Sequence, residues 1–194
     1  MIETNKDGAM GKTLSEMTLE ELWQLFPVFL TEHNPDWAAW YAEEAARIEG
    51  LLPPDTELFH IGSTAVNGIK AKPIIDILIT VSEPSRLTQA AQILQSNGCI
   101  IMSSGAERIS LNRGYTENGF AERVFHYHIR LRGDADEILF RDYLNSRPDV
   151  AKEYEALKLK LCKKFEHDRD AYTDAKTEFV KKYTLLAKAQ CKNA

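Results

Sequence analysis

One acidic residue stands inside an otherwise apolar run. The segment Ile74-Ile75-Asp76-Ile77-Leu78-Ile79-Thr80-Val81 has the near-continuous apolar character of a strand that is covered on both faces. Burying an unpaired carboxylate costs several kcal/mol, so an acid in such a strand needs a hydrogen-bonding partner or a metal ion. Asp76 is therefore the first candidate for a catalytic and metal-binding residue.

A glycine-serine turn precedes this strand. Gly62, Ser63 and Thr64 follow a short apolar segment, and Asp76 comes thirteen residues after Ser63. Glycine lets the backbone approach a phosphate closely, and a hydroxyl beside exposed N–H groups forms an anion cradle. Most Gly-Ser pairs are only turns, but an acid on the adjacent strand could hold the Mg²⁺ that bridges such phosphates. We expect these three residues to bind phosphate.

The position that would pair with Asp76 carries no acid. Two-metal phosphoryl transfer usually needs several carboxylates that converge from one side. Side chains alternate along a strand, so position 78 shares the face of Asp76, and it is Leu78. Glu57 or Glu122 could approach in three dimensions, and the sequence leaves this open.

Histidines form a second candidate group. His126 and His128 are two residues apart in a predicted strand and so point to one face, and His60 ends the strand before the glycine turn. With Asp76, two imidazoles could make a two-histidine, one-carboxylate metal site. The same pattern also fits histidines that hydrogen-bond in a polar cleft, or that contact a phosphate or substrate. We keep His126 and His128 as candidate catalytic residues and all three histidines as candidate ligands.

Basic residues form the third group. Lys72 directly precedes the buried strand, and Arg141 borders an apolar helix face. Lys176 falls on an apolar stripe that begins at Tyr172, so it either extends to water along its methylenes or points into a cleft. Arginine suits bidentate contacts to phosphate. We expect Lys72, Arg141 and Lys176 to neutralise the charge of a phosphorylated ligand.

Composition limits the classes of partner. The chain has 194 residues, a net charge of −5 and three widely spaced cysteines. The acidic balance argues against general nucleic-acid binding, and the cysteines form neither a disulfide framework nor a zinc motif. No leader segment and no long apolar run is present, so we expect a cytoplasmic protein without a membrane span.

Periodicity indicates strands in the middle of the chain with helices on either side. Residues 1–17 look like a flexible segment, and Thr18 with Glu21 forms a capping box. Residues 18–194 fit one α+β domain whose part 134–194 is helical, with Asp134 and Glu137 at the start of its first helix. The expected helices are 18–30, 35–50, 83–97, 134–145, 150–165 and 172–186. The expected strands are 56–61, 73–81, 99–102 and 123–131, with a strand and a flexible loop in 107–121.

These motifs, taken together, resemble the GrpB family. The resemblance covers roughly residues 20–188 in the family's order. It rests on these segments: His60-Ile61-Gly62-Ser63-Thr64-Ala65-Val66, Ala71-Lys72-Pro73-Ile74-Ile75-Asp76, His126-Tyr127-His128, Phe140-Arg141-Asp142-Tyr143-Leu144, Tyr154 to Lys158 and Tyr172 to Lys176.

The resemblance implies a fold and a site. GrpB proteins are similar to the nucleotidyltransferase superfamily, which implies an α/β fold with a small mixed sheet flanked by helices. Gly62 and Ser63 would then cradle nucleotide phosphates, and Asp76 would bind Mg²⁺. The superfamily's second acid falls at Leu78, and its third falls near His126 and His128, where no acid stands.

Three functions follow as expectations. The first is a Mg²⁺-dependent nucleotidyl or phosphoryl transferase that acts on an unknown acceptor. The second is a non-catalytic protein that binds a nucleotide or another phosphorylated small molecule on the same scaffold. The third is a metal-dependent hydrolase built on histidine and aspartate.

Overall fold

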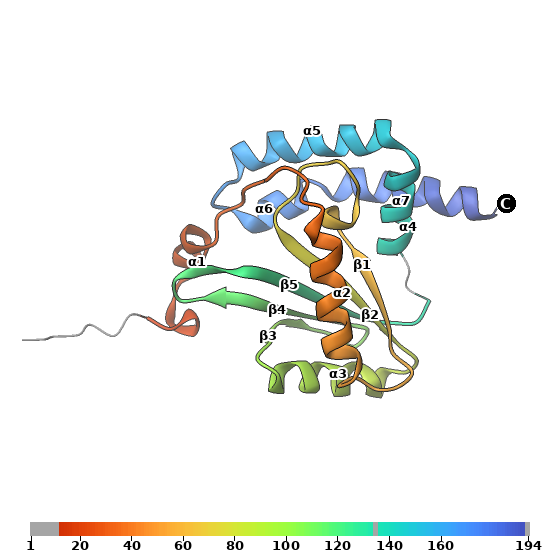
Figure 1. Ribbon diagram of the computed structural model, residues 1–194. Coiled ribbons are helices and arrows are strands. Elements are labelled where there is room, and N and C mark those ends of the chain that lie inside the picture. Colours follow the sequence, from red (N-terminus) through yellow and green to blue (C-terminus); the bar gives the residue numbers. More distant parts are fainter. Residues whose placement is uncertain (1–11, 134–135, 193–194) are drawn as a thin grey trace, which may run out of the picture.

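The fold is built on a five-stranded mixed sheet. The computed structural model describes residues 12–133 and 136–192, and its sheet has the order β1-β2-β5-β4-β3 (Figure 1). β2 pairs with β5 in parallel, whereas the other neighbours are antiparallel. The strands are β1 Glu57–Ile61, β2 Ile74–Val81, β3 Ile100–Ser104, β4 Arg108–Thr116 and β5 Gly119–Leu131.

Helices flank this sheet, as predicted. In Figure 1 the C-terminal helices α4 to α7 gather above the sheet, α3 lies below it, and α2 crosses in front. None of the helices in the described residues has the length and apolar character needed to cross a membrane. The helices are α1 Leu19–Leu25, α2 Asp36–Glu49, α3 Pro84–Ser96, α4 Asp136–Ser146, α5 Pro148–Lys164, α6 Arg169–Asp174 and α7 Thr177–Lys192, with short 3₁₀ helices η1 Leu14–Glu16 and η2 Ser63–Ala65.

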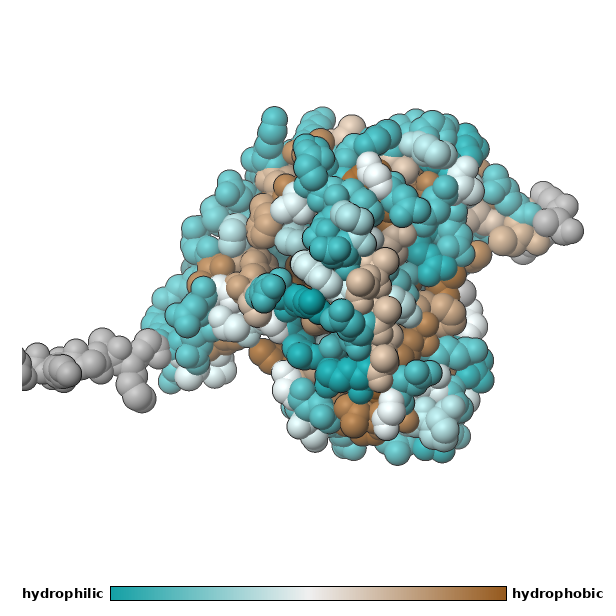
Figure 2. Space-filling model, viewed as in Figure 1, coloured by the Kyte–Doolittle hydropathy of each residue, from teal (hydrophilic) through white to brown (hydrophobic). Residues whose placement is uncertain are grey.

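The two larger apolar clusters of the described residues hold the layers together. Alternate residues of β2, Ile75, Ile77 and Ile79, face α2 and α3 and belong to the larger cluster. The smaller cluster joins α4, α5 and α7 to the residues that follow the glycine turn. Because side chains alternate along β2, the other face of the strand is directed toward the C-terminal helices, where Asp76 lies. Figure 2 shows the α2 side of the molecule, where hydrophilic residues dominate the surface over that helix.

The first helix is shorter than predicted. Thr18 and Glu21 form the expected capping box, with the Thr18 hydroxyl accepting from the Glu21 N–H at 3.2 Å and the Glu21 carboxylate accepting from the Thr18 N–H at 2.8 Å. The helix ends at Leu25 rather than near residue 30. Proline at 27 disfavours helical backbone at Phe26, which adopts φ −123° and ψ 65°.

Two further segments differ from the sequence prediction. Residues 107–121 form a hairpin instead of a strand and a flexible loop, because β5 begins at Gly119 and pairs back to Thr116. The last predicted helix is divided into α6 and α7, since the backbone turns at residues 175–176. Lys176 therefore lies between two helices. Of the N-terminal segment, residues 1–11 lie outside the described residues, as does the predicted cap at Asp134.

Candidate active site

Parallel pairing of β2 with β5 assembles the candidate metal ligands. Asp76 is the register partner of His126, and Leu78 is the partner of His128. Asp76 Oδ1 lies 3.1 Å from His128 Nε2 and 3.4 Å from His126 Nδ1. One ligand atom from each of the three residues lies within 4.8 Å of the others. The sheet thus brings together the carboxylate and the two strand histidines that the sequence pattern selected.

The glycine turn packs directly against Asp76. Gly62 has φ 72° and ψ −170°, a conformation that is essentially restricted to glycine. A Cβ at this position would lie 2.3 Å from Asp76 Oδ2, so no other residue fits. Thr64 is buried and donates to the Ile74 carbonyl at 3.2 Å, which ties the turn to the start of β2. Burial raises the pKa of Tyr154 to about 12, and the neighbouring Ser63 side chain opposes this shift. The backbone of Gly62 therefore lies in direct contact with the Asp76 carboxylate.

The ionisation of this group suits a divalent cation. Burial raises the pKa of Asp76, but hydrogen bonds from His126 and His128 outweigh burial and hold it below its usual range. Burial lowers the pKa of His126 to about 4, although Asp76 opposes this shift. The site therefore presents an ionised carboxylate beside two imidazoles, which offer the oxygen and nitrogen donors that metal ions accept. The residues present fit a divalent cation.

A cleft of about 770 Å³ separates this site from the C-terminal helices. The helix side of the cleft is strongly basic: Lys158 comes from α5, Arg169 from α6 and Lys176 from the turn before α7. Lys72 adds a fourth cation from the segment before β2. The ring of Tyr172 lies between two of them, 5.3 Å from Lys72 Nζ and 4.2 Å from Lys176 Nζ.

These four cations make no ion pair with a carboxylate in the part of the chain that the structure describes. Burial lowers the pKa of Lys72 to about 7, with the charges of Arg169 and Lys176 adding to the effect. Burial likewise lowers the pKa of Lys158 to about 7 and that of Lys176 to about 8. Asp76 attracts Lys72 and Lys176 without reaching ion-pair distance. Such a cluster favours an added anion.

His60 and Arg141 lie apart from this arrangement. His60 Nε2 is 3.0 Å from Thr64 Oγ1, and the ring stacks on Tyr41 at 4.8 Å between centroids. Arg141 donates to the His60 carbonyl at 2.7 Å and pairs with Asp142, and it does not line the cleft. The geometry gives both side chains protein partners around the turn. It brings neither to the metal ligands.

Among the residues that the structure describes, no second carboxylate joins Asp76, because position 78 carries leucine. Leu78 is fully buried, at 0% exposure. Glu57 pairs with Arg132 at 3.0 Å and accepts from Thr80, toward the far end of β2. Glu122 is exposed on β5. Asp76 is therefore the one acid of the described residues in the group that could hold a metal.

Sequence reasoning missed Lys158 and Arg169. Lys158 stands on the buried stripe of α5, between Tyr154 and Leu161, and it is 1% exposed. A lysine on an apolar stripe is the signal that selected Lys176, so Lys158 was detectable in the same way. Arg169 carries no comparable local signal, because only the fold brings α6 to β5.

Comparison with known proteins agrees with this architecture. The sequence profile of the family described as GrpB protein matches residues 27–185. The Glutamate-rich protein GrpB of Alkalihalophilus pseudofirmus is 34% identical over 79% of this chain and 91% of its own length. The UPF0157 protein YqkA of Bacillus subtilis is 32% identical over 84% of this chain, and the match spans only 49% of that longer protein. The crystal structure of GrpB from Enterococcus faecalis superposes with a TM-score of 0.70 at 30% identity, covering 82% of this chain and 96% of that one.

Proposed function

The chain belongs to the GrpB family, and we propose that it is a divalent-cation-dependent nucleotidyl or phosphoryl transferase. Its cleft would bind a nucleotide or another phosphorylated small molecule beside Asp76. The observation that carries this proposal is a set of four cleft cations that make no ion pair with a carboxylate among the described residues and share the cleft with a carboxylate and two histidines.

Charge balance explains why this observation points to phosphate. Buried and half-buried cations that share one cleft destabilise the ligand-free protein, because each loses hydration without gaining a counter-charge. A phosphate chain supplies several negative charges and many acceptor oxygens in a small volume, which lysine and arginine bind well. The acceptor would enter from the rest of the cleft, beyond Asp76.

Each residue has a distinct role in the proposed reaction. The backbone of Gly62 and Ser63 and the Ser63 hydroxyl would hold phosphate oxygens, while Lys72 and Lys176 would balance the charge on the leaving phosphate. A new bond would form between an acceptor oxygen and phosphorus as the phosphoanhydride bond breaks, and the acceptor's proton would pass to water in the cleft. A divalent cation held at Asp76, with Mg²⁺ the first candidate, would neutralise charge on the phosphate oxygens.

Thermal melting tests ligand binding. ATP, GTP, CTP and UTP are each titrated with Mg²⁺, and at least one is expected to raise the melting temperature of the wild-type chain. This stabilisation should disappear in both Ser63→Ala and Asp76→Asn. No shift with any nucleotide, at concentrations up to the millimolar range, rejects the proposal. Transfer of a radiolabelled phosphate or nucleotide to an acceptor then tests catalysis.

One observation favours a second candidate, a non-catalytic binder of nucleotides or phosphometabolites. Leu78 is fully buried where a second metal-binding acid would stand, so the carboxylates needed for two-metal transfer are incomplete. Binding that requires Ser63 and Asp76 but gives no transfer would identify this function.

The grouping of Asp76 with His126 and His128 also supports a third candidate, a metal-dependent hydrolase. Imidazole nitrogens suit Zn²⁺ and Fe²⁺ better than Mg²⁺. Stabilisation by Zn²⁺ or Fe²⁺ without any nucleotide, lost in His126→Ala, would favour this candidate over both others.

A further inference from the structure

The two histidines beside Asp76 have different surroundings. His126 Nε2 lies 2.8 Å from the Tyr115 hydroxyl and 3.2 Å from Arg169 Nη2. A guanidinium can only donate, so this nitrogen must carry the lone pair and Tyr115 must also donate to it. The ring proton is then on Nδ1, which faces Asp76 Oδ1 at 3.4 Å. Both nitrogens of His126 are therefore engaged by protein groups.

His128 is less constrained. Its Nε2 lies 3.1 Å from Asp76 Oδ1, and its side chain is 25% exposed against 13% for His126. Asp76 is its hydrogen-bond partner within the described residues. His128 lines the cleft, and its ring also meets the ring of His126 edge-on, with 6.3 Å between centroids.

Arg169 brings a fixed positive charge to the same place. Its guanidinium lies 5.2 Å from the centroid of the Tyr115 ring and lines the cleft. Tyr115 itself stacks on His126, with 5.8 Å between ring centroids. An arginine beside His126 Nε2 repels a cation there, so a metal ion at that nitrogen would have to displace it.

We propose that the centre binds one divalent cation, held by Asp76 and His128, and that Arg169 supplies the second positive charge facing the phosphate chain. His126 and Tyr115 are then positioning residues that orient the guanidinium of Arg169. Position 78, on the face of Asp76, carries leucine, and Asp76 is the one acid of the described residues in the group that could hold a metal. The other acids that line the cleft, Asp136 and Glu137, pair with Lys188 and Arg130. This inference rests on the proposed function, because it assumes a phosphorylated ligand in the cleft.

The number of ions gives the first test. The full chain is titrated with Mn²⁺, and free Mn²⁺ is followed by electron paramagnetic resonance, with and without inorganic pyrophosphate. One Mn²⁺ per chain is expected. Two per chain would overturn the inference and leave the proposed function standing. No bound Mn²⁺ under either condition would overturn the proposed function itself.

Paired variants separate the histidines. His128→Asn should weaken Mn²⁺ binding by about 10-fold to 100-fold, as loss of a ligand does. His126→Asn keeps a donor at the Nδ1 position and removes only the acceptor for Arg169. It should leave Mn²⁺ affinity within about threefold while weakening pyrophosphate binding about 10-fold, the loss expected for one charge-assisted contact.

Arginine variants complete the test. Arg169→Gln should weaken pyrophosphate binding at least as much as His126→Asn and leave the Mn²⁺ stoichiometry at one. Tyr115→Phe should also weaken pyrophosphate binding, but by a smaller factor than Arg169→Gln. Arg86→Gln, on the exposed surface of α3, is the matched control and should change neither quantity. A larger loss of Mn²⁺ affinity in His126→Asn than in His128→Asn would reverse the assignment and overturn the inference.

Discussion

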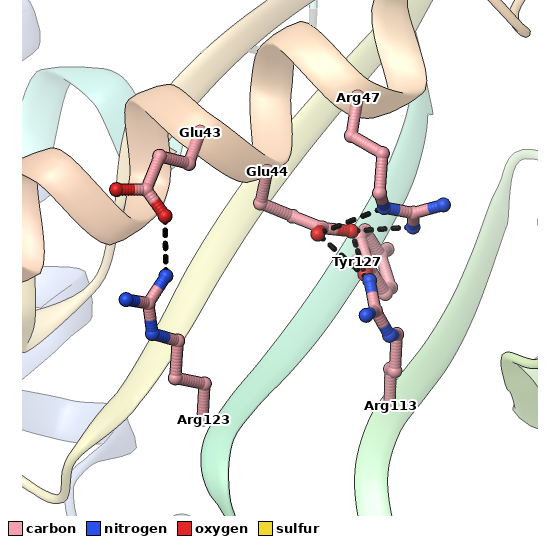
Figure 3. Close-up of polar contacts among 6 residues, drawn as sticks. All are labelled: Glu43, Glu44, Arg47, Arg113, Arg123 and Tyr127. Carbon is pink, nitrogen blue, oxygen red and sulfur yellow. Dashed lines mark hydrogen bonds and ion pairs between the residues drawn. The ribbon is translucent and has the colours of Figure 1, made fainter.

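The two faces of the sheet handle buried charge differently. On the α2 face, the Glu44 side chain is 5% exposed and accepts from Arg47 at 2.6 and 3.0 Å, from Arg113 at 2.7 Å and from Tyr127 at 2.6 Å (Figure 3). Burial raises the pKa of Glu44, and these donors together more than offset it. The Glu44 carboxylate therefore receives its hydrogen bonds and its counter-charges from the protein itself.

The cleft face shows the opposite pattern. Four cations line the cleft that borders Asp76 and make no ion pair with a carboxylate among the described residues: Lys72, Lys158, Arg169 and Lys176. Lys158 Nζ donates instead to the Lys70 carbonyl at 2.5 Å. A buried charge that is paired within the protein contributes to the fold. A buried charge without a counter-charge is suited to binding a ligand of the opposite charge. Substitutions on the two faces should therefore have opposite effects on stability.

Removing Glu44 should have the largest effect. Glu44→Ala leaves Arg47, Arg113 and Tyr127 without their shared acceptor, so the free energy of unfolding should fall by about 3–5 kcal/mol, as when a buried ion pair is broken. Urea denaturation measures this change. The neighbouring Glu43→Ala is the control, since Glu43 is 63% exposed and pairs with a half-exposed Arg123, and it should cost about 1 kcal/mol or less. Equal losses in the two variants would contradict the comparison.

Acid should destabilise the fold through the buried histidines. Burial lowers the pKa of His60 from 6.5 to about 4, and that of His126 likewise to about 4. Between these values the unfolded chain binds a proton that the folded chain does not. The contribution of these two histidines to stability is therefore complete above pH 6.5 and falls as the pH drops toward 4, by about 3 kcal/mol for each histidine.

Urea unfolding at pH 7 and at pH 4.5 tests whether the free energy of unfolding falls as the pH is lowered. The ordinary pKa of a glutamate is 4.5, and that of Glu44 in the fold is lower. The contribution of Glu44 to stability therefore changes mainly below pH 4.5. His60→Gln can keep the bond to Thr64 and should remove roughly half of the decline. A decline of the same size in wild type and His60→Gln would show that His60 is not its source.

Removing a cleft cation should stabilise the ligand-free protein. Lys72→Met keeps the length of the side chain and removes one uncompensated charge. The free energy of unfolding should therefore rise by about 1 kcal/mol, the lower end of the gain seen when buried charges are replaced by apolar groups. Stabilisation by nucleotide should decrease in the same variant. Thermal melts with and without ligand measure both, and a loss of stability without ligand would contradict the comparison.

Arg141→Gln should have the smallest effect on the cleft. The side chain donates to the His60 carbonyl and does not line the cavity. Nucleotide affinity should change by less than about threefold, which is under 1 kcal/mol. Competition binding at fixed Mg²⁺ measures this. A tenfold loss would show that Arg141 reaches the ligand, as the sequence pattern suggested.

Local patterns in the sequence predicted the sheet side of the site. The apolar run around Asp76 and the two-residue spacing of His126 and His128 each determine which face a side chain occupies, and the structure follows both. The mixed sheet flanked by helices also agrees with the prediction. Parallel pairing of β2 and β5, which places Asp76 opposite His126, depends on contacts between segments about fifty residues apart, and no local pattern encodes it.

The helix side of the site was less predictable. Lys176 was identified from a stripe that the structure interrupts, since the chain turns between α6 and α7, yet the side chain does line the cleft. Arg141 borders an apolar face as expected, but that face packs around the glycine turn. Arg169 reaches His126 only through the packing of α6, so it could not be predicted from its neighbours in sequence.

Calorimetric titration with inorganic tripolyphosphate and Mg²⁺ tests the central claim most directly, because this probe carries the phosphate chain without any particular base. The account predicts one bound tripolyphosphate per wild-type chain and an affinity at least about tenfold lower in Asp76→Asn and in Lys72→Met, with Arg86→Gln unchanged. The absence of binding at millimolar concentrations, or equal affinity in all four proteins, would contradict it.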